Sequence, residues 1–292
     1  MKLKTFITKL ILPVTLKFLL STALYSQGTD YTMNKVEQKK IFLGISLNGS
    51  QTSISNDLSF LSITSKMGKS LNGRVEVGYF FTRMIGISIG LGYSSYSSQL
   101  FLNKDTGSIL QKDSENEDYI MKITGKSISE DQKISFLNIP VCLDIRLPLG
   151  QKLGFFIQGG INFGIPLDKT YNTSGIFTYE GEYYQYPVLL HDIPKFGFAT
   201  DTSIQGKGNF QLKSINTSIL AVAGINYSFS ETLSINLGIQ FTRSFANISD
   251  YKNTNPFILS TKINVLNSFM AGSSNSGFHA LGLSLGLKYY IK

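Results

Sequence analysis

The chain has 292 residues, of which 16% are charged, with 27 glycines, 15 tyrosines, 21 phenylalanines and no tryptophan. Its formal charge of +8 is too small to indicate a nucleic-acid partner once the lysine-rich N-terminus is set aside. The single cysteine, Cys142, excludes an internal disulfide and leaves a metal or redox cofactor unsupported, because such sites need clustered ligands. No segment has the roughly 20 consecutive apolar residues of a membrane-spanning helix. Low charge without such a helix fits membrane-crossing strands, in which apolar residues alternate with small or polar ones.

The first 26 residues have the layout of a secretory signal peptide. Lysines at positions 2, 4 and 9 precede an apolar run over residues 10–24, which only Pro13 and Lys17 interrupt, and small residues follow. A membrane anchor is the alternative, but the run is short for one and carries Lys17. Cleavage after Ala23 and cleavage after Ser26 both stay open. The polar residues 27–40 are predicted to form a flexible lead to a single domain over residues 41–292.

Alternation with a period of two begins at residue 41 and predicts strands, because successive side chains of a strand point to opposite faces. The first run covers residues 41–48 and is followed by a predicted loop over 50–70, rich in Ser, Thr and Asn. Two further runs, 74–81 and 85–93, flank a minimal connection and predict a hairpin. Residues 99–132 are predicted to form a long polar loop.

The next strand, over residues 133–147, contains a change of phase. Ile134 and Phe136 are apolar at even positions, whereas the apolar positions from Ile139 to Leu147 are odd. A β-bulge near residues 137–138 would produce this change, and a bulge also tolerates Pro140 in a central strand. A strand that begins only after Pro140 is the alternative.

Four more alternating runs complete the predicted fold, over residues 153–165, 213–229, 233–241 and 277–292. Predicted loops over 166–212 and 247–276 separate them, so long and short connections alternate along the chain. Eight strands place both ends and all short turns on one side, which is the arrangement of outer-membrane barrels with short periplasmic turns. The predicted fold class is therefore all-β: an eight-stranded antiparallel up-and-down transmembrane β-barrel with long extracellular loops.

A soluble barrel would also alternate, so the character of the two faces decides between the two classes. The non-apolar face is mostly Gly, Ser, Asn and Gln, whereas a surface in water is normally about a quarter or more charged. These small residues suit the narrow interior of an eight-stranded barrel, so the aliphatic face is predicted to meet lipid. Aromatic residues cluster where interfacial belts are expected. They are Phe80, Phe81, Phe155, Phe229, Tyr289 and Tyr290 at the short-turn end, and Tyr93, Phe136, Phe163, Phe241 and Phe278 near the loop end.

Five charged residues are predicted to face the interior: Arg74, Glu76, Asp144, Arg146 and Lys288. Charges in a tight interior need partners, because an unpaired buried ion is very costly. We therefore expect one ion-pair network that plugs the barrel. A gated ion path is the alternative.

Only two histidines are available for nucleophilic catalysis, His191 and His279. A lipid hydrolase or acyltransferase would need a Ser–His pair oriented by an acid or amide. His279 is expected to point inward near Ser276, but no motif surrounds it. A rim histidine bonded to backbone is the simpler interpretation, and no enzymatic activity is predicted.

The longest predicted loop is rich in tyrosine and is a candidate binding surface, carried by Tyr179, Tyr183, Tyr184 and Tyr186. Tyrosine clusters favour interfaces, because the side chain is amphipathic and costs little entropy to order. The alternative is a lid or extended hairpin that packs on itself.

Three features together resemble a known family. They are the signal peptide ending near Ser26-Gln27, the segment Phe136-Leu137-Asn138-Ile139-Pro140-Val141 before a short turn, and the closing strand that ends LGLKYYIK. This combination looks like the PorT-like outer-membrane β-barrel proteins of Bacteroidota. The chain ends in Ile291-Lys292 instead of the terminal aromatic residue of many such barrels. The resemblance implies a non-enzymatic protein of the bacterial outer membrane, surrounded by outer-membrane lipid, with envelope or secretion proteins as candidate partners. The expected role is a structural or binding barrel that displays surface loops. A lipid-modifying enzyme and a narrow pore or transporter are the alternatives.

Overall fold

A computed structural model describes residues 41–57, 63–251 and 266–291. All of them belong to the larger of the two units into which the chain divides, Lys39–Lys292. The predicted signal peptide and the lead over residues 27–40 lie outside the described residues. In the described part, the helices are all too short or too polar to cross a membrane.

The described residues form antiparallel strands and two short 3-10 helices, which confirms the all-β prediction. The strands are β1 (Ile41–Asn56), β2 (Ile63–Phe80), β3 (Ile85–Lys112), β4 (Asp118–Pro148), β5 (Leu153–Tyr183), β6 (Val188–Leu190), β7 (Ala199–Asn209), β8 (Asn216–Ser228), β9 (Leu233–Ser244) and β10 (Ser276–Ile291). The helices are η1 (Pro194–Phe196) and η2 (Phe269–Gly272).

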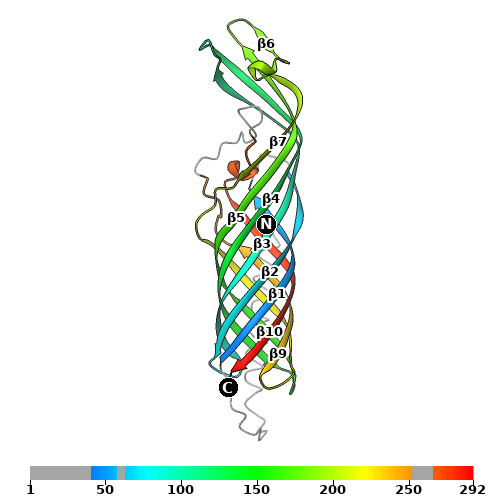
Figure 1. Ribbon diagram of the computed structural model, residues 1–292, viewed down its shortest axis with the longest axis vertical. Helices are drawn as coiled ribbons and strands as arrows, with labels where there is room; N and C mark the ends of the chain where they lie inside the picture. Colours follow the sequence, from blue (N-terminus) through cyan, green and yellow to red (C-terminus); the bar gives the residue numbers. More distant parts are fainter. Residues whose placement is uncertain (1–40, 58–62, 252–265, 292) are drawn as a thin grey trace, which may run out of the picture. The chain divides into compact units, whose positions relative to one another are not determined.

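Eight strands pair in a closed ring, in the order β1-β2-β3-β4-β5-β8-β9-β10 and back to β1 (Figure 1). The ring closes where β1 pairs with β10 over its whole length, from Ile41↔Ile291 to Asn56↔Ser276. The short connections predicted between β2 and β3, β4 and β5, and β8 and β9 are present, at 81–84, 149–152 and 229–232. β6 and β7 lie outside the ring and pair with β5.

The alternation predicted from sequence separates the two faces of the ring. In β10, Leu281, Leu283 and Leu285 are 56%, 65% and 49% exposed, whereas Ser284 and Lys288 are only 5% and 6% exposed. The other ring strands repeat this arrangement, with aliphatic residues outward and polar residues inward. The leucines therefore do not pack into the interior, as they would in a soluble barrel.

The predicted aromatic belts are only partly correct. Phe81, Phe155, Phe229 and Tyr289 point outward at the short-turn end, and Tyr93, Phe163 and Phe241 point outward further along. Phe80, Tyr290, Phe136 and Phe278 are buried inside instead. Neighbouring aromatic residues in a strand necessarily face opposite ways, so a cluster in sequence is split between the surface and the interior.

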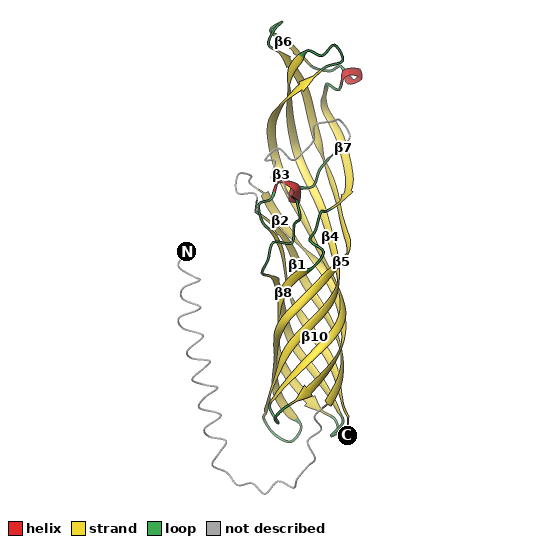
Figure 2. Cartoon of the chain, turned by 90° about the vertical axis from the view of Figure 1, so that its left-hand side faces the viewer, coloured by secondary structure: helices red, strands yellow, loops and turns green. Residues whose placement is uncertain are grey.

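Most of the predicted loop residues are strand. β1 runs to Asn56, β3 and β4 continue as a hairpin to a turn at residues 113–117, and β5 continues to Tyr183 (Figure 2). The predictions of loops over 50–70, 99–132 and 166–212 are therefore wrong for most of their residues, and of these ranges only residues 58–62 lie outside the described part of the chain. In these extensions the apolar residues, such as Tyr119, Ile123 and Phe177, face inward and mostly polar residues face outward, and pairing across strands satisfies the backbone. The predicted loops followed from the polar composition of these segments and not from this alternation. Of the predicted loop over 247–276, residues 252–265 lie outside the described residues.

The predicted bulge near residues 137–138 is also wrong. The register between β3 and β4 is unchanged from Ile85↔Ile145 to Lys112↔Asp118, and the nearest irregularity lies between β4 and β5 at Ile134/Phe136. Even-numbered side chains of β4 stay buried on both sides of Pro140. The apolar residues change from even to odd positions because the buried side chains of β4, which fill the interior, are apolar at Ile134 and Phe136 and small or polar from Asn138 onward, while the outward side chains become aliphatic.

That apolar filling forms two clusters beyond the polar interior. One cluster contains Ile54, Tyr96, Ile134, Phe136, Phe210, Leu212, Ile248, Met270, Phe278 and Ala280. The second lies on the extended parts of β3, β4 and β5 and includes Tyr119, Ile123, Phe177, Tyr179, Tyr183, Phe198 and Phe269. The segment around η2 contributes to both clusters and links them.

Candidate functional site

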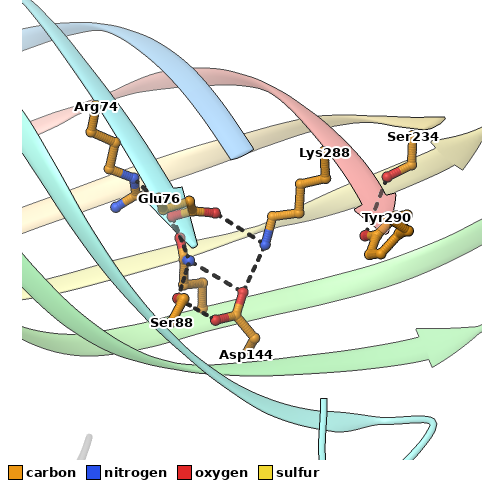
Figure 3. A network of polar contacts seen from close by, with 8 residues as sticks. Arg74, Glu76, Ser88, Asp144, Ser234, Lys288 and Tyr290 are labelled. Atoms are coloured by element: carbon orange, nitrogen blue, oxygen red, sulfur yellow. Dashed lines mark hydrogen bonds and ion pairs between the residues drawn. The ribbon is translucent and has the colours of Figure 1, made fainter. Parts of the chain in front are cut away.

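The interior of the ring holds a compact cluster of charged side chains (Figure 3). Lys288 Nζ lies 2.8 Å from Asp144 Oδ1 and 3.2 Å from Glu76 Oε1, and Arg74 Nε lies 3.3 Å from Glu76 Oε2. β2, β4 and β10 supply these four residues, so the cluster spans the interior. Two cations face two carboxylates, and the charges balance.

Neutral side chains complete this cluster, and the sequence did not single them out. Gln158 Nε2 donates to Glu76 Oε2 at 3.1 Å and to Asp144 Oδ1 at 3.2 Å, and Ser88 Oγ donates to Asp144 Oδ2 at 2.5 Å. Gln158 Oε1 accepts from Arg74 Nη2. The available signal was the register, since Ser88 and Gln158 fall at inward positions in β3 and β5. Buried ions become tolerable when hydrogen bonds satisfy their remaining lone pairs.

Arg146 does not join the network by an ion pair among the described residues, contrary to the prediction. Its guanidinium carbon lies 4.0 Å from the ring centroid of Phe80 and 4.3 Å from that of Tyr290. With Phe42, these two rings form a small cluster near the short-turn end. An arginine over aromatic faces gains cation–π stabilisation, which is larger where water is excluded. Arg146 therefore closes the interior by stacking on rings.

A glycine makes room for the central carboxylate. A Cβ at Gly44 would lie 2.8 Å from Glu76 Cγ and 3.0 Å from its Oε1. Gly44 and Glu76 are directly paired across β1 and β2. The small residues of the inner face thus set the space into which the charged side chains fit.

Beyond the charged cluster the interior is polar and almost filled. Asn162 Nδ2 donates to Asn138 Oδ1 at 2.8 Å, and Asn138 Nδ2 donates to Ser94 Oγ at 2.7 Å. The cavity bounded by these asparagines, Arg74 and Tyr96 has a volume of about 40 Å³. That is room for a few water molecules.

A second buried carboxylate, Glu130, lies in the segment that was predicted to be a loop. It is fully buried and accepts four hydrogen bonds at 2.6–2.9 Å, from Gln132 Nε2, Thr173 Oγ1, Ser268 Oγ and the backbone N–H of Phe269. Burial raises the pKa of Glu130 above its usual value, while these hydrogen bonds oppose the shift. Two of the donors belong to the segment at η2, so Glu130 fastens that segment to β4 and β5. No local sequence pattern around Glu130 predicts this contact.

The candidate tyrosines separate into two groups. Tyr179 and Tyr183 are buried in the outer apolar cluster, where Tyr183 stacks on Tyr119 at a centroid distance of 5.1 Å. Tyr184 and Tyr186 are 67% and 55% exposed. The Tyr186 hydroxyl donates to Glu117 Oε1 at 2.6 Å and ties the turn after β5 to the β3–β4 turn. Only the latter pair remains a candidate contact surface.

The histidines do not form a catalytic arrangement within the described residues. His279 is half-buried and alternates with the inward Phe278 and Ala280, so the prediction that it points inward is wrong. Ser276 faces the interior and donates to Asn56 Oδ1 at 2.9 Å. His191 is exposed and lies 3.0 Å from Asp192. No group of three metal-ligating side chains occurs in the described part of the chain.

Comparison with known proteins gives a family and several similar structures. Residues 35–191, more than half of the chain, match the family described as outer membrane protein beta-barrel domain. A comparison with curated proteins found no match. Among solved structures, OprG of Pseudomonas aeruginosa is 12% identical with a TM-score of 0.37, over 86% of this chain and 95% of that one. Neisserial surface protein A is 9% identical with a TM-score of 0.34, over 87% and 98%. Ail of Yersinia pestis, solved with the heparin analogue sucrose octasulfate, is 9% identical with a TM-score of 0.31, over 86% and 99%.

Proposed function

This chain belongs to the outer membrane protein β-barrel domain family, and from that premise we propose that it is a closed transmembrane barrel with a structural or binding role. The observation that carries the proposal is the direction of the side chains in the eight-stranded ring, which is opposite to that in a soluble barrel. Its large aliphatic side chains face outward, and its interior holds a neutralised ion cluster. Hydrocarbon is the environment that suits such an outer face, since a lysine or arginine at the bilayer midplane costs about 2–4 kcal/mol.

The membrane orientation follows from the connections. The three short turns, the start of β1 and the end of β10 all lie on one side of the ring. In outer-membrane barrels this side faces the periplasm. Figures 1 and 2 show that β3, β4 and β5 extend beyond the other ring strands, on the side away from the short turns. In the proposed orientation this extension lies on the cell-surface side. We also propose that a signal peptide over residues 1–26 directs export of the chain. Within the family, we propose that the chain is related to the PorT-like proteins.

Three features support a closed barrel over a pore. The ion cluster occupies the interior near the short-turn end, together with Arg146 and the aromatic side chains of Phe80 and Tyr290 that it contacts. The polar layer beyond it leaves about 40 Å³. The apolar clusters and the segment at η2 fill the interior further along.

A binding role is favoured over an enzymatic one. His279 and Ser276 face opposite sides of β10, so they cannot act as a nucleophile and its base. The exposed Tyr184 and Tyr186 at the far end of the extension are suited to contact with a partner protein. We propose that this partner belongs to an envelope or secretion assembly.

Surface labelling and conductance test the proposal together. In a Cys142→Ser background, a membrane-impermeant maleimide should label Tyr184→Cys on intact cells and should label Gly150→Cys, in the exposed turn after β4, only after lysis. The purified protein should give no channel steps in a planar bilayer. Labelling with the opposite sidedness, or regular conductance steps, would refute this function.

A further inference from the structure

A groove lies on the outer face where β2, β3, β4, β5 and β7 run side by side. It has a volume of about 690 Å³, within the usual range of small-molecule sites. Its lining side chains are mostly polar or charged, with the exposed Met67 as the one large aliphatic residue, in contrast to the aliphatic surface nearer the short turns. We propose that this groove binds the phosphorylated headgroup of an anionic glycolipid of the outer leaflet, an inference that rests on the membrane placement proposed above.

Strand pairing aligns the groove residues in two adjacent rows. One row crosses all five strands through the consecutive pairs Lys66↔Gln99, Gln99↔Asp131, Asp131↔Asn172 and Asn172↔Lys207. The next row contains Ser97, Lys133, Thr170 and Asn209. Four strand spacings separate Lys66 from Lys207, roughly 19 Å. A single phosphate cannot reach both ends of such a row, whereas a phosphorylated oligosaccharide can.

The lysines of the groove differ from those in the rest of the extension in their ion pairs. Lys112, Lys122 and Lys126, further along β3 and β4, each form an ion pair with an acid, at 2.9–3.3 Å. Among the described residues no ion pair joins Lys66, Lys133 or Lys207 to an acid. These three cations with Asp131 leave the groove a net charge of about +2. Ammonium groups offer charge to phosphate, and the amides, hydroxyls and carboxylate offer hydrogen bonds to sugar hydroxyls.

The position of the groove relative to the aliphatic band points to a lipid as the source of that phosphate. On β5 the series of large outward residues that begins at the short-turn end stops at Leu167, which is 54% exposed, and Thr170 follows three residues later. A single aliphatic residue beyond the groove, Ile176, is 38% exposed. Three residues of strand cover about 10 Å, or about 7 Å along the membrane normal at a 45° tilt. The headgroup layer of a bilayer is about 7 Å thick on each side. The groove therefore lies at the level of the headgroups when the band lies in hydrocarbon.

Lipid binding by matched charge variants tests the proposal. The full-length mature protein is purified in detergent, and native mass spectrometry follows titration with lipid A, a phosphorylated glucosamine-disaccharide lipid. The triple variant Lys66→Gln/Lys133→Gln/Lys207→Gln should bind lipid A about 100-fold more weakly than wild type. Each basic residue near an anionic surface strengthens binding by a similar factor, and the effects of the three losses multiply. The control Lys112→Gln/Lys122→Gln/Lys126→Gln makes the same charge change on the paired lysines and should stay within about threefold of wild type.

Two further probes identify the source of the phosphate. Dephosphorylated lipid A should bind wild type as weakly as lipid A binds the groove variant. Glucosamine 6-phosphate and inorganic phosphate should bind at least about 100-fold more weakly than lipid A, because they lack the acyl chains and span only part of the row. Equal effects of the two triple variants, no effect of either, or tight binding of the soluble phosphates would overturn the proposal.

Folding and membrane placement are measured in separate experiments. All six substitutions are at exposed or half-exposed positions, and the shift in gel mobility between unheated and heated samples reports whether each variant is folded. If Tyr184→Cys is labelled on intact cells but the groove variant binds lipid A normally, only this inference fails. If the labelling fails, the proposed function fails with it.

Discussion

Lys288 Nζ and Asp144 Oδ1 lie 2.8 Å apart in the interior of the ring, although 144 residues separate them in the chain. The same ammonium group lies 3.2 Å from Glu76 and 4.1 Å from the ring of Phe42. One lysine thus holds two carboxylates from different strands and also contacts the aromatic cluster near the short turns. Four predictions follow from the interior and the extension.

Replacing Lys288 with methionine should strongly destabilise the ring. The change leaves Glu76 and Asp144 facing one another without their shared cation, and breaking a buried ion pair costs about 3–5 kcal/mol. The measurement is urea unfolding of the protein refolded in lipid vesicles. Lys152→Met, in the exposed turn between β4 and β5, is the matched control and should change the free energy of unfolding by less than about 0.5 kcal/mol. A loss below about 1 kcal/mol in Lys288→Met would show that the cluster does not stabilise the ring.

The thiol of Cys142 should report whether water and small cations reach the interior. Cys142 is 3% exposed and faces the interior, directly opposite Ser88 across β3 and β4. In the folded protein its reaction with a cationic methanethiosulfonate should be at least about 100-fold slower than that of Gly150→Cys in a Cys142→Ser background, because reaction requires opening of the structure. After unfolding in urea the two thiols should react at similar rates. Rapid modification of folded wild type would indicate an open path and contradict the closed interior.

The buried Glu130 should make the stability of the protein depend on pH in a defined direction. Burial raises its pKa in the folded state, so between the unfolded and folded pKa values the folded protein binds the extra proton. Its contribution to the free energy of unfolding is therefore complete below the unfolded pKa and is lost as pH rises through the folded pKa. One proton gives a slope of at most about 1.4 kcal/mol per pH unit.

Urea unfolding of wild type and Glu130→Gln between pH 4 and pH 8 measures that contribution as a difference, in which the other titrating groups cancel. The difference should decrease as pH rises. A constant offset between the two curves would show that Glu130 does not titrate with folding.

The tip of the extension should be dispensable for folding but needed for binding. Residues 184–197 contain β6, which pairs only with β5, and η1, which has no buried residue. Replacing them with a Gly-Ser linker removes the partly buried Leu190 and Ile193 from the outer apolar cluster, so the free energy of unfolding should fall by no more than about 3 kcal/mol and the ring should still fold. Pull-down from native membranes should then lose a partner that Tyr184→Ala/Tyr186→Ala also loses. Failure of the linker variant to fold would make the tip a structural element.

Local alternation allowed much of the ring to be predicted from sequence. A period of two fixes which residues of a strand share a face, so the outward leucines of β10 and the inward Glu76, Asp144 and Lys288 follow from parity within each strand. Parity also shows why His279 could not point inward, since it shares a face with Leu281. The sequence could not place Arg146, because the choice between a carboxylate and an aromatic ring depends on side chains from other strands.

The remaining features were decided by contacts between segments far apart in the chain. Ile134 and Phe136 face the same interior as Asn138, and only the three-dimensional structure shows that the filling of the tube changes from polar to apolar between them. Glu130 acquires its role from Ser268 and Phe269, which approach it across the interior. A strand records its own two faces in its sequence, because alternation is a property of the backbone. What lies against each face depends on the closure of the ring, which no single segment encodes.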